Sequence, residues 1–273
     1  MKKFEGILIC TDLDGTLLQD DKSVAPKDLE AIEYFKSEGG AFTIVTGRLP
    51  YFIGDIVDRV RPNAPVGCGN GEAVYDFESK KYLHTVLLDR SSLELVDYVM
   101  EHIDGLGMHI NTYEEILFCR ENESMEIFRR LTGVPNITCD YNTYDGEIAK
   151  IVFGDTREEA IRLLDKLLTT HGRADEFDFI RSEKMLYEIL PKGTNKGASL
   201  LKIAEILGID RKNTIAVGDY FNDIPMIKEA GVGIAVGNAR TLVKEAADIV
   251  TVSNSENAMA RIIEDIDSGK IIF

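Results

Sequence analysis

Two kinds of hydrophobic pattern alternate along this chain of 273 residues. Largely apolar runs such as Ile7–Thr11 and Ala41–Val45 are typical of strands that are buried on both faces of a parallel sheet. Three later runs, at Thr214–Val217, Val232–Val236 and Ile249–Val252, repeat this pattern. Between the runs, apolar residues recur at helical spacing. The alternation predicts an α/β fold with a doubly wound, Rossmann-like and mostly parallel sheet.

Turn and capping residues place the ends of the predicted helices and hairpins. A helix is expected to begin near Pro26 and to end at Glu38–Gly40, and a second is expected from Tyr51 to about Arg59. Asn195 is a plausible N-cap for a helix that closes at Gly208. Residues 65–75 predict two strands joined by a tight Asn-Gly turn, and this turn is the safer interpretation of Asn70, although its side chain could reach a site.

The middle of the chain has a different order of predicted strands and helices, which predicts an inserted α/β domain. We expect residues 1–82 and 190–273 to form the catalytic core, and residues 83–189 to form the insertion, with an open-faced sheet and helices on one side. The expected strands of the insertion are 83–88, 108–112, 116–119, 148–153, 177–181 and 185–190, and its expected helices are 91–103, 123–131 and 157–170.

The net charge of the chain limits the classes of molecule that it is expected to bind. The formal net charge is -16, and no run of basic residues is longer than a pair, so we expect neither nucleic acid nor an anionic membrane surface as a partner. The first apolar stretch is too short for the core of a signal peptide, and no run approaches the about 20 apolar residues that span a bilayer. Four widely spaced cysteines suit a reducing cytoplasm. Oligomeric state cannot be inferred from these features.

Candidate chemistry begins directly after the first strand. Asp12 and Asp14 stand one residue apart and, in an extended segment, would point the same way. Two converging carboxylates favour a hard dication with oxygen ligands, Mg²⁺, and Gly15 would let backbone N–H groups approach an anion. The alternative to a metal site is an Asp-Gly turn without a functional role. A calcium loop is excluded because Thr16 occupies a position that requires Asp or Asn.

A second and a third group of polar residues could bind an anion. Thr46, Gly47 and Arg48 follow the second strand, where phosphate binding and a helix N-cap by Thr46 are equally good interpretations. Lys196 falls in the first turn of a predicted helix, where a cation opposes the helix dipole. This misfit is a small indication that Lys196 meets an anion, and a solvated lysine is the alternative.

The fourth group follows the strand at Thr214–Val217. Asp219, Asn222 and Asp223 again place carboxylates and an amide at the carboxyl end of a buried strand, where open α/β sheets bind their ligands. Both common nucleotide-binding fingerprints are missing from the sequence.

The order of these motifs resembles a known family. D-x-D-G-T at 12–16, T-G-R at 46–48, a lysine before a helix and G-D-x-x-N-D at 218–223 resemble the four motifs of the haloacid dehalogenase superfamily of phosphatases. The insertion resembles the large α/β cap of its Cof-type, sugar-phosphatase-like branch. The resemblance covers nearly the whole chain and implies a cytoplasmic, Mg²⁺-dependent phosphomonoester hydrolase that acts on small phosphorylated metabolites such as sugar phosphates.

The resemblance also implies roles for individual residues. Asp12 would attack phosphorus and become an aspartyl-phosphate, while Asp14 would protonate the leaving alcohol and then deprotonate the hydrolytic water. The metal would be held by the Asp12 carboxylate, the Asp14 backbone carbonyl and the Asp219 carboxylate. The remaining members of the implied site are Thr46, Gly47, Lys196 and Asn222 as phosphate-binding residues, and Asp223 as a support for the metal or Lys196.

For Asp14 to act as an acid, its pKa must be raised, and a cap that closes over the site would exclude water and raise it. The two chain crossings, near 80–88 and 190–192, would then form the hinge. Arg48, Glu188 and the segment Met108–Tyr113 are candidates for substrate contacts.

Two other functions remain open. A phosphomutase of the same superfamily would require a bisphosphate activator, whereas a sugar-phosphate-binding regulator would bind the ligand with little turnover.

Overall fold

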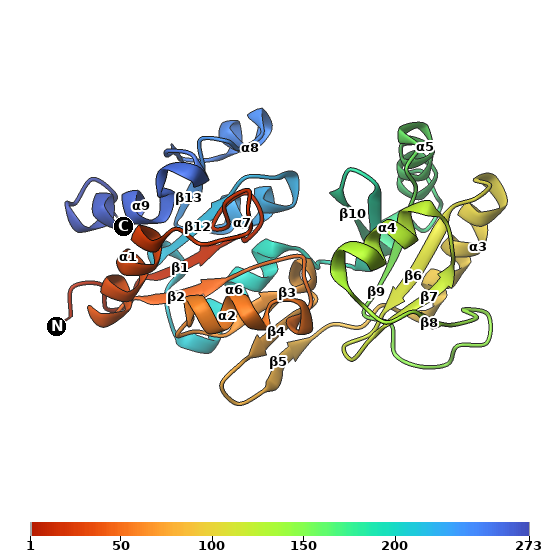
Figure 1. The fold of residues 1–273 in the computed structure, drawn as a ribbon, viewed down its shortest axis with the longest axis horizontal. Coiled ribbons are helices and arrows are strands. Elements are labelled where there is room, and N and C mark those ends of the chain that lie inside the picture. The colour runs from red at the N-terminus through yellow and green to blue at the C-terminus, as the bar shows by residue number, and fades with distance from the viewer. Residues whose placement is uncertain (1, 273) are drawn as a thin grey trace. The chain divides into compact units, whose positions relative to one another are not determined.

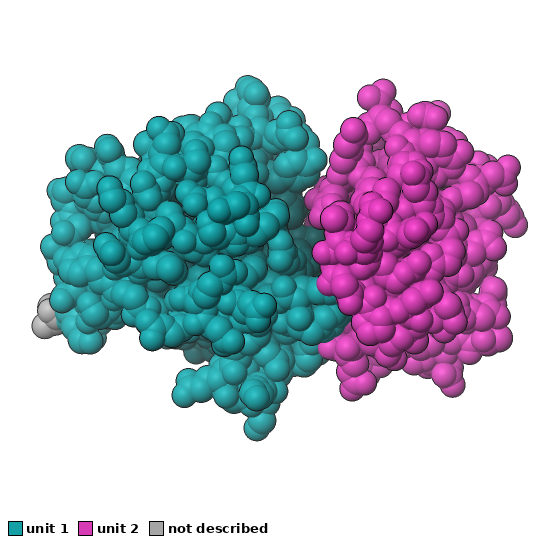
Figure 2. Space-filling view, viewed as in Figure 1, with its two compact units in different colours: residues 1–85, 195–273 teal, residues 86–194 magenta. Residues whose placement is uncertain are grey.

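The computed structural model describes residues 2–272, and the chain forms two compact units (Figures 1 and 2). Unit 1 contains the chain up to Thr85 and again from Asn195 onward, and unit 2 contains Val86–Thr194. The chain therefore passes from one unit to the other twice.

Unit 1 is built on a parallel sheet, which confirms the predicted doubly wound α/β class. Its strand order is β14-β13-β12-β1-β2, and every pairing within it is parallel. The strands β1, β2, β12 and β13 are almost entirely buried, as their apolar runs predict. The strands of this sheet are β1 (Leu8–Thr11), β2 (Ala41–Ile44), β12 (Thr214–Gly218), β13 (Val232–Ala235) and β14 (Ile249–Val250).

The helices of unit 1 are short, and α1 contacts α9 while α6 contacts α7. Asn195 caps α6 by accepting a hydrogen bond from the Ala198 N–H at 3.0 Å, and Gly208 ends the helix in the left-handed conformation, as predicted. No helix in residues 2–272 is long and apolar enough to cross a membrane. The helices are α1 (Pro26–Ser37), α2 (Gly54–Val60), α6 (Lys196–Leu207), α7 (Ile224–Glu229), α8 (Thr241–Ala246) and α9 (Ala258–Asp267).

A small antiparallel sheet, β3 (Val66–Cys68), β4 (Ala73–Asp76) and β5 (Lys81–Thr85), completes unit 1. A bridge between Val45 and Gly67 connects it to the end of β2. The strand expected at 83–88 in the insertion was therefore misplaced, because β5 belongs to unit 1. A hairpin returns β5 onto β4, and the apolar pattern of a strand does not specify such a partner.

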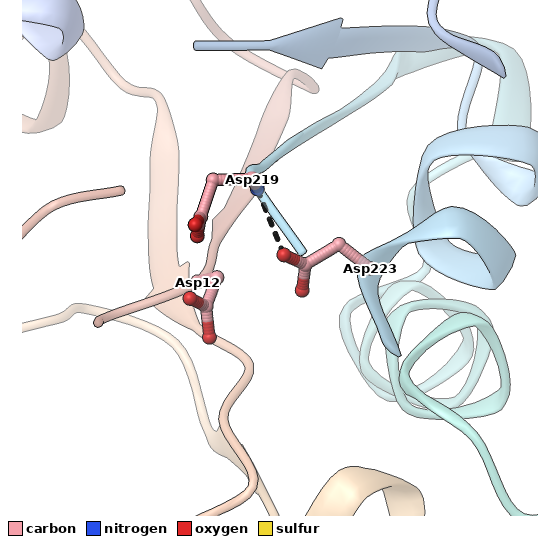
Figure 3. Close-up of side chains that lie close together, drawn as sticks. All are labelled: Asp12, Asp219 and Asp223. Atoms are coloured by element: carbon pink, nitrogen blue, oxygen red, sulfur yellow. Dashed lines mark hydrogen bonds between the residues drawn. The ribbon is translucent and has the colours of Figure 1, made fainter. Parts of the chain in front are cut away.

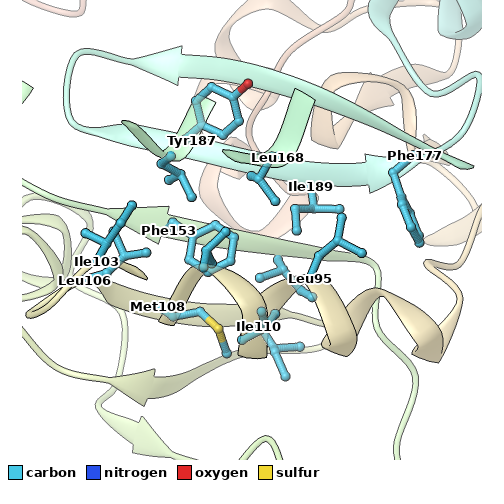
Figure 4. Close-up of a cluster of buried hydrophobic side chains, with 14 of the residues drawn as sticks. Leu95, Ile103, Leu106, Met108, Ile110, Phe153, Leu168, Phe177, Tyr187 and Ile189 are labelled. Carbon is cyan, nitrogen blue, oxygen red and sulfur yellow. The ribbon is translucent and has the colours of Figure 1, made fainter. Parts of the chain in front are cut away.

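Unit 2 has a six-stranded sheet in the order β10-β11-β9-β6-β7-β8. Apolar residues of β6, β9 and β11 pack with α3 and α5 to form its core, part of which is drawn in Figure 4. Burial of this face accounts for the helical and strand periodicities of the middle of the chain. The elements are α3 (Leu93–His102), β6 (Gly107–Asn111), β7 (Ile116–Arg120), α4 (Glu123–Thr132), β8 (Ile137–Thr138), β9 (Lys150–Gly154), α5 (Glu158–Thr169), β10 (Phe177–Glu183) and β11 (Leu186–Pro191).

The expectation that all helices of the insertion cover one side of its sheet is wrong for α4. Met125 of α4 lies so close to Gly107 and Gly154 that a Cβ atom on either glycine would meet it within 3 Å. These glycines alternate along β6 and β9 with residues of the α3/α5 core, so they face the opposite side. Phe128 of α4 stacks on His109 of β6 on this second side, at 5.0 Å between ring centroids. Glycines leave room for a helix that the sequence pattern does not assign to either face.

Candidate active site

The carboxyl ends of three neighbouring strands carry the predicted motifs. The backbone N–H of Asp12 donates to the carbonyl of Val217 at 2.9 Å, and the N–H of Val45 donates to Thr11 at 2.8 Å. The residues that follow β1, β2 and β12 are therefore neighbours at one edge of the sheet. This is the edge at which parallel α/β sheets bind ligands.

Three carboxylates meet at this edge (Figure 3). Asp12, Asp219 and Asp223 each bring an oxygen atom to within 4.8 Å of the others. A Cβ atom on Gly15 would lie 2.7 Å from Oδ2 of Asp219, so only glycine allows the loop after β1 to approach Asp219 this closely. Thr16 donates from Oγ1 to Oδ1 of Asp219 at 2.8 Å and orients that carboxylate.

Lys196 lies among these carboxylates. Its Nζ is 2.6 Å from Oδ1 of Asp12 and 2.6 Å from Oδ1 of Asp223, and the lysine is only 1% exposed. Burial alone would lower the pKa of Lys196, but the charges of Asp12 and Asp223 outweigh it and raise the pKa. Lys196 therefore meets negative charge, as its position in the sequence suggested, and its partners here are two aspartates of the chain.

Crowding of like charges changes the titration of the aspartates. Burial raises the pKa of Asp219 to about 6, and the nearby Asp223 carboxylate adds to this shift. Burial likewise raises the pKa of Asp12, against the opposing charge of Lys196. Buried carboxylates whose charged forms are disfavoured are suited to a hard cation with oxygen ligands such as Mg²⁺. The donor set thus fits the predicted metal.

Asp223 is arranged differently from Asp12 and Asp219. Its Oδ2 accepts hydrogen bonds from the backbone N–H groups of Asp219 and Tyr220 at 2.8 and 2.9 Å, while its Oδ1 contacts Lys196. Both oxygens are therefore used to hold the loop after β12 and the lysine. This arrangement suits a supporting role better than direct metal binding.

Asp14 points to a different set of partners. Arg48 donates to it from Nε at 2.8 Å and from Nη2 at 2.6 Å, and Lys22 donates from Nζ at 2.8 Å. Burial would raise the pKa of Asp14, but these charged donors outweigh it and hold the pKa below its usual value. The expectation of a raised pKa for Asp14 is wrong for this structure. The forked contact with Arg48, 34 residues away along the chain, is the physical reason.

The loop after β2 contacts Asn70, which the sequence predicts to lie in a tight turn. Thr46 is buried, and its Oγ1 accepts a hydrogen bond from the N–H of Arg48 at 3.2 Å. A Cβ atom on Gly47 would lie 3.0 Å from the side-chain amide of Asn70. Asn222 donates from Nδ2 to Oδ1 of Asn70 at 3.0 Å. Asn70 therefore lies between Gly47 and Asn222. The sequence indicates this role only by an asparagine that stands between two glycines after a buried strand.

Glu188 belongs to unit 2, whereas the residues assembled on the parallel sheet belong to unit 1. It is buried on β11, with Oε2 3.0 Å from Nζ of Lys150 on β9. The segment Met108–Tyr113 includes β6, a strand of the same sheet.

Comparison with known proteins gives concordant matches. A model of the haloacid dehalogenase-like hydrolases matches residues 9–263. A 5-amino-6-(5-phospho-D-ribitylamino)uracil phosphatase, YcsE of Bacillus subtilis strain 168, is 30% identical over 256 residues, which cover 94% of each chain. The pyridoxal phosphate phosphatase YbhA of Escherichia coli strain K12 is 28% identical, covering 94% of this chain and 97% of that protein.

Among solved structures, a haloacid dehalogenase-like hydrolase from Bacteroides thetaiotaomicron aligns with a TM-score of 0.82 at 26% identity, covering 95% of this chain and 99% of that one. The similarity thus extends over both units.

Proposed function

Because this chain belongs to the haloacid dehalogenase-like hydrolases and is a phosphatase, we propose that it is a Mg²⁺-dependent phosphomonoester hydrolase that works through an aspartyl-phosphate on Asp12. One observation carries the proposal: the buried carboxylate of Asp12 lies 2.6 Å from the Lys196 ammonium and shares a small volume with Asp219. A carboxylate held beside a cation in this way can approach a phosphate dianion that would otherwise repel it.

In the proposed first step, a carboxylate oxygen of Asp12 attacks phosphorus, the ester P–O bond breaks, and Asp14 gives a proton to the leaving alkoxide. In the second step water attacks the aspartyl-phosphate, Asp14 takes a proton from that water, and the Asp12 carboxylate and inorganic phosphate are released. The first step needs the protonated form of Asp14. The contacts of Asp14 with Arg48 and Lys22 lower its pKa and favour the ionised form, which is the form that takes the proton from water in the second step.

Other residues of unit 1 would bind the phosphoryl group and the ion. Lys196 and Thr46 would contact phosphoryl oxygens, assisted by Gly47 and Asn222. Asp12 and Asp219, with the backbone carbonyl of Asp14, would hold Mg²⁺, which supplies positive charge that offsets the repulsion between carboxylate and phosphate. Asp223 would keep Lys196 in place through their 2.6 Å contact.

The proposed substrate is a small phosphorylated metabolite, with a sugar or polyol phosphate as the leading class. The two named relatives act on phosphate esters of small polar compounds, one of them on a phosphorylated ribityl chain. We propose that unit 2 is a cap that selects the substrate, with Glu188 as one of its contacts. Arg48, which already binds a carboxylate through a fork of two donors, is a second candidate for a substrate contact in unit 1.

The test is release of inorganic phosphate from p-nitrophenyl phosphate and from a panel of sugar and polyol phosphates, with Mg²⁺ and with EDTA. Asp12→Asn keeps the shape of the side chain and removes the nucleophile, so we expect activity to be lost. Asp267→Asn, which removes a half-exposed ion pair with Lys3 at the end of α9, serves as the matched control and is expected to keep full activity.

Phosphate release that persists in Asp12→Asn, or that does not need a divalent cation, would refute the mechanism. Phosphate transfer that depends on an added bisphosphate, with little net release, would instead identify a mutase.

A further inference from the structure

The turn Gly69–Gly71 has an unusual backbone for a segment that contains an asparagine. Its three residues all have positive φ, with values of 64°, 62° and 115°. Asn70 is also fully buried, with 0% exposure. A residue other than glycine in this region carries strain of about 1 kcal/mol or more. Glycine would relieve that strain, so the asparagine side chain calls for a reason of its own.

The backbone of this turn holds the loop after β2. The N–H of Gly69 donates to the carbonyl of Arg48 at 3.1 Å, and the N–H of Asn70 donates to the carbonyl of Thr46 at 3.0 Å. Two consecutive backbone donors thus bind the two ends of the Thr46–Arg48 segment. The conformation of that segment depends on the left-handed turn beside it.

The other side of the turn rests on the start of α6. A Cβ atom on Gly71 would lie 2.2 Å from the carbonyl oxygen of Asn195, the residue that caps α6 and precedes Lys196. The side chain of Asn70 meets a third segment, because its Oδ1 accepts the hydrogen bond from Nδ2 of Asn222. The three segments that carry Thr46, Lys196 and Asn222 therefore each contact the turn Gly69–Gly71.

We propose that Asn70 is a positioning residue of the phosphoryl-binding site, which orients the Asn222 amide and the Thr46–Gly47 turn toward the same phosphoryl group. The inference rests on the proposed function, because it concerns how that site is held in shape. Asn70 can adopt the left-handed backbone that the turn needs and still supply an amide. Glycine lacks the amide, and alanine lacks the amide and also disfavours the left-handed backbone.

Four variants separate the amide from the backbone: Asn70→Gly, Asn70→Ala, Asn222→Ala and the double variant Asn70→Gly/Asn222→Ala. We expect Asn70→Gly to keep the unfolding temperature and to lower kcat/KM for p-nitrophenyl phosphate by about 10- to 100-fold, the usual effect of removing an orienting partner. Orthovanadate, tested as an inhibitor with Mg²⁺, should bind more weakly by a similar factor. The double variant should lose hardly more than one single variant, because both remove the same interaction.

Asn257→Gly is the matched control, since Asn257 also has a left-handed backbone, with φ of 60°, and lies at the start of α9. Its activity should equal that of the wild type. Wild-type kcat/KM in Asn70→Gly, or losses that multiply in the double variant, would overturn the proposal.

If the wild type hydrolyses no ester, the proposed function fails and calorimetry with orthovanadate decides the role of Asn70. Weaker binding by Asn70→Gly would still support that role, whereas equal binding, or no binding by the wild type, would overturn it.

Discussion

Lys196 contacts the carboxylates of Asp12 and Asp223 with almost no access to solvent. Such a cluster is costly to desolvate, and its charges compensate each other only while every member is present. The same residues that unit 1 would use on a phosphate thus also determine its stability. Asp14 shows the opposite arrangement, since its partners Arg48 and Lys22 hold it ionised at the surface of the site.

Replacement of the central cation should therefore affect stability and activity together. Lys196→Met leaves two buried carboxylates without their partner, and we expect the free energy of unfolding to fall by about 3–5 kcal/mol in urea denaturation without divalent cations. Because the pKa of Lys196 is raised, its contribution is lost only as pH rises through that higher pKa, so the deficit should be present across pH 6–8.

Lys202→Met is the control for this change, because Lys202 lies on the same helix in a surface pair with Glu205 and should cost well under about 1 kcal/mol. Equal losses in the two variants would contradict a structural role for the buried pair.

At the scale of elements, β6 shows how one strand serves two environments. Met108 and Ile110 face the core with α3 and α5, whereas Gly107 and His109 face α4. His109 is 1% exposed, and burial, reinforced by the charge of Lys150, lowers its pKa to about 3. The imidazole is therefore neutral in the folded state at any pH at which the protein is expected to work.

This burial predicts an acid-dependent loss of stability. Below the histidine pKa of about 6.5 in the unfolded chain, His109 binds a proton in the unfolded state but stays neutral in the folded state. Unfolding is therefore favoured, and stability falls, as pH decreases. We expect this residue to account for about 2 kcal/mol of lost unfolding free energy between pH 7 and pH 5. His109→Phe, which can keep the stacking on Phe128, should remove that part of the loss in urea denaturation at the two pH values.

His102→Phe, at an exposed position on α3, should leave the pH dependence as it is in the wild type. An unchanged acid loss in His109→Phe would show that other groups cause it.

At the scale of the whole molecule, a net charge of -16 means that any cation stabilises the chain to some extent by screening. Specific binding of Mg²⁺ must therefore be distinguished from general screening by cations. The division into two units makes this comparison possible, because the aspartate cluster belongs to unit 1 and a control substitution can be placed in unit 2.

We expect MgCl2 to raise the unfolding temperature above the value in NaCl of equal ionic strength, because an ion that binds only the folded cluster stabilises it by mass action. Asp219→Asn removes one carboxylate of the cluster and should reduce this difference, whereas Asp175→Asn in unit 2 should not. A Mg²⁺ effect that is equal in all three proteins would place the ion elsewhere. Scanning calorimetry is the suitable measurement, since it resolves separate transitions if the units unfold independently.

The sequence by itself determined the α/β class, the elements of the parallel sheet and the strand ends at which Asp12, Thr46 and Asp219 would stand. A strand that is buried on both faces has an unbroken apolar run, and the polar residue that ends this run marks the edge of the sheet. Both features can be recognised within a short stretch of sequence. Capping residues such as Asn195 and Gly208 are local for the same reason.

Only the tertiary structure decided which of these groups meet. The pairing of Arg48 with Asp14, the contact of Asn70 with Asn222, the return of β5 onto β4 and the position of α4 all join segments whose distance in space no periodicity encodes. The pKa of Asp14 follows from such a contact, and so its direction could not be obtained from residue type and spacing. Local patterns determine which face of an element is buried, whereas side-chain partners depend on how distant elements come together.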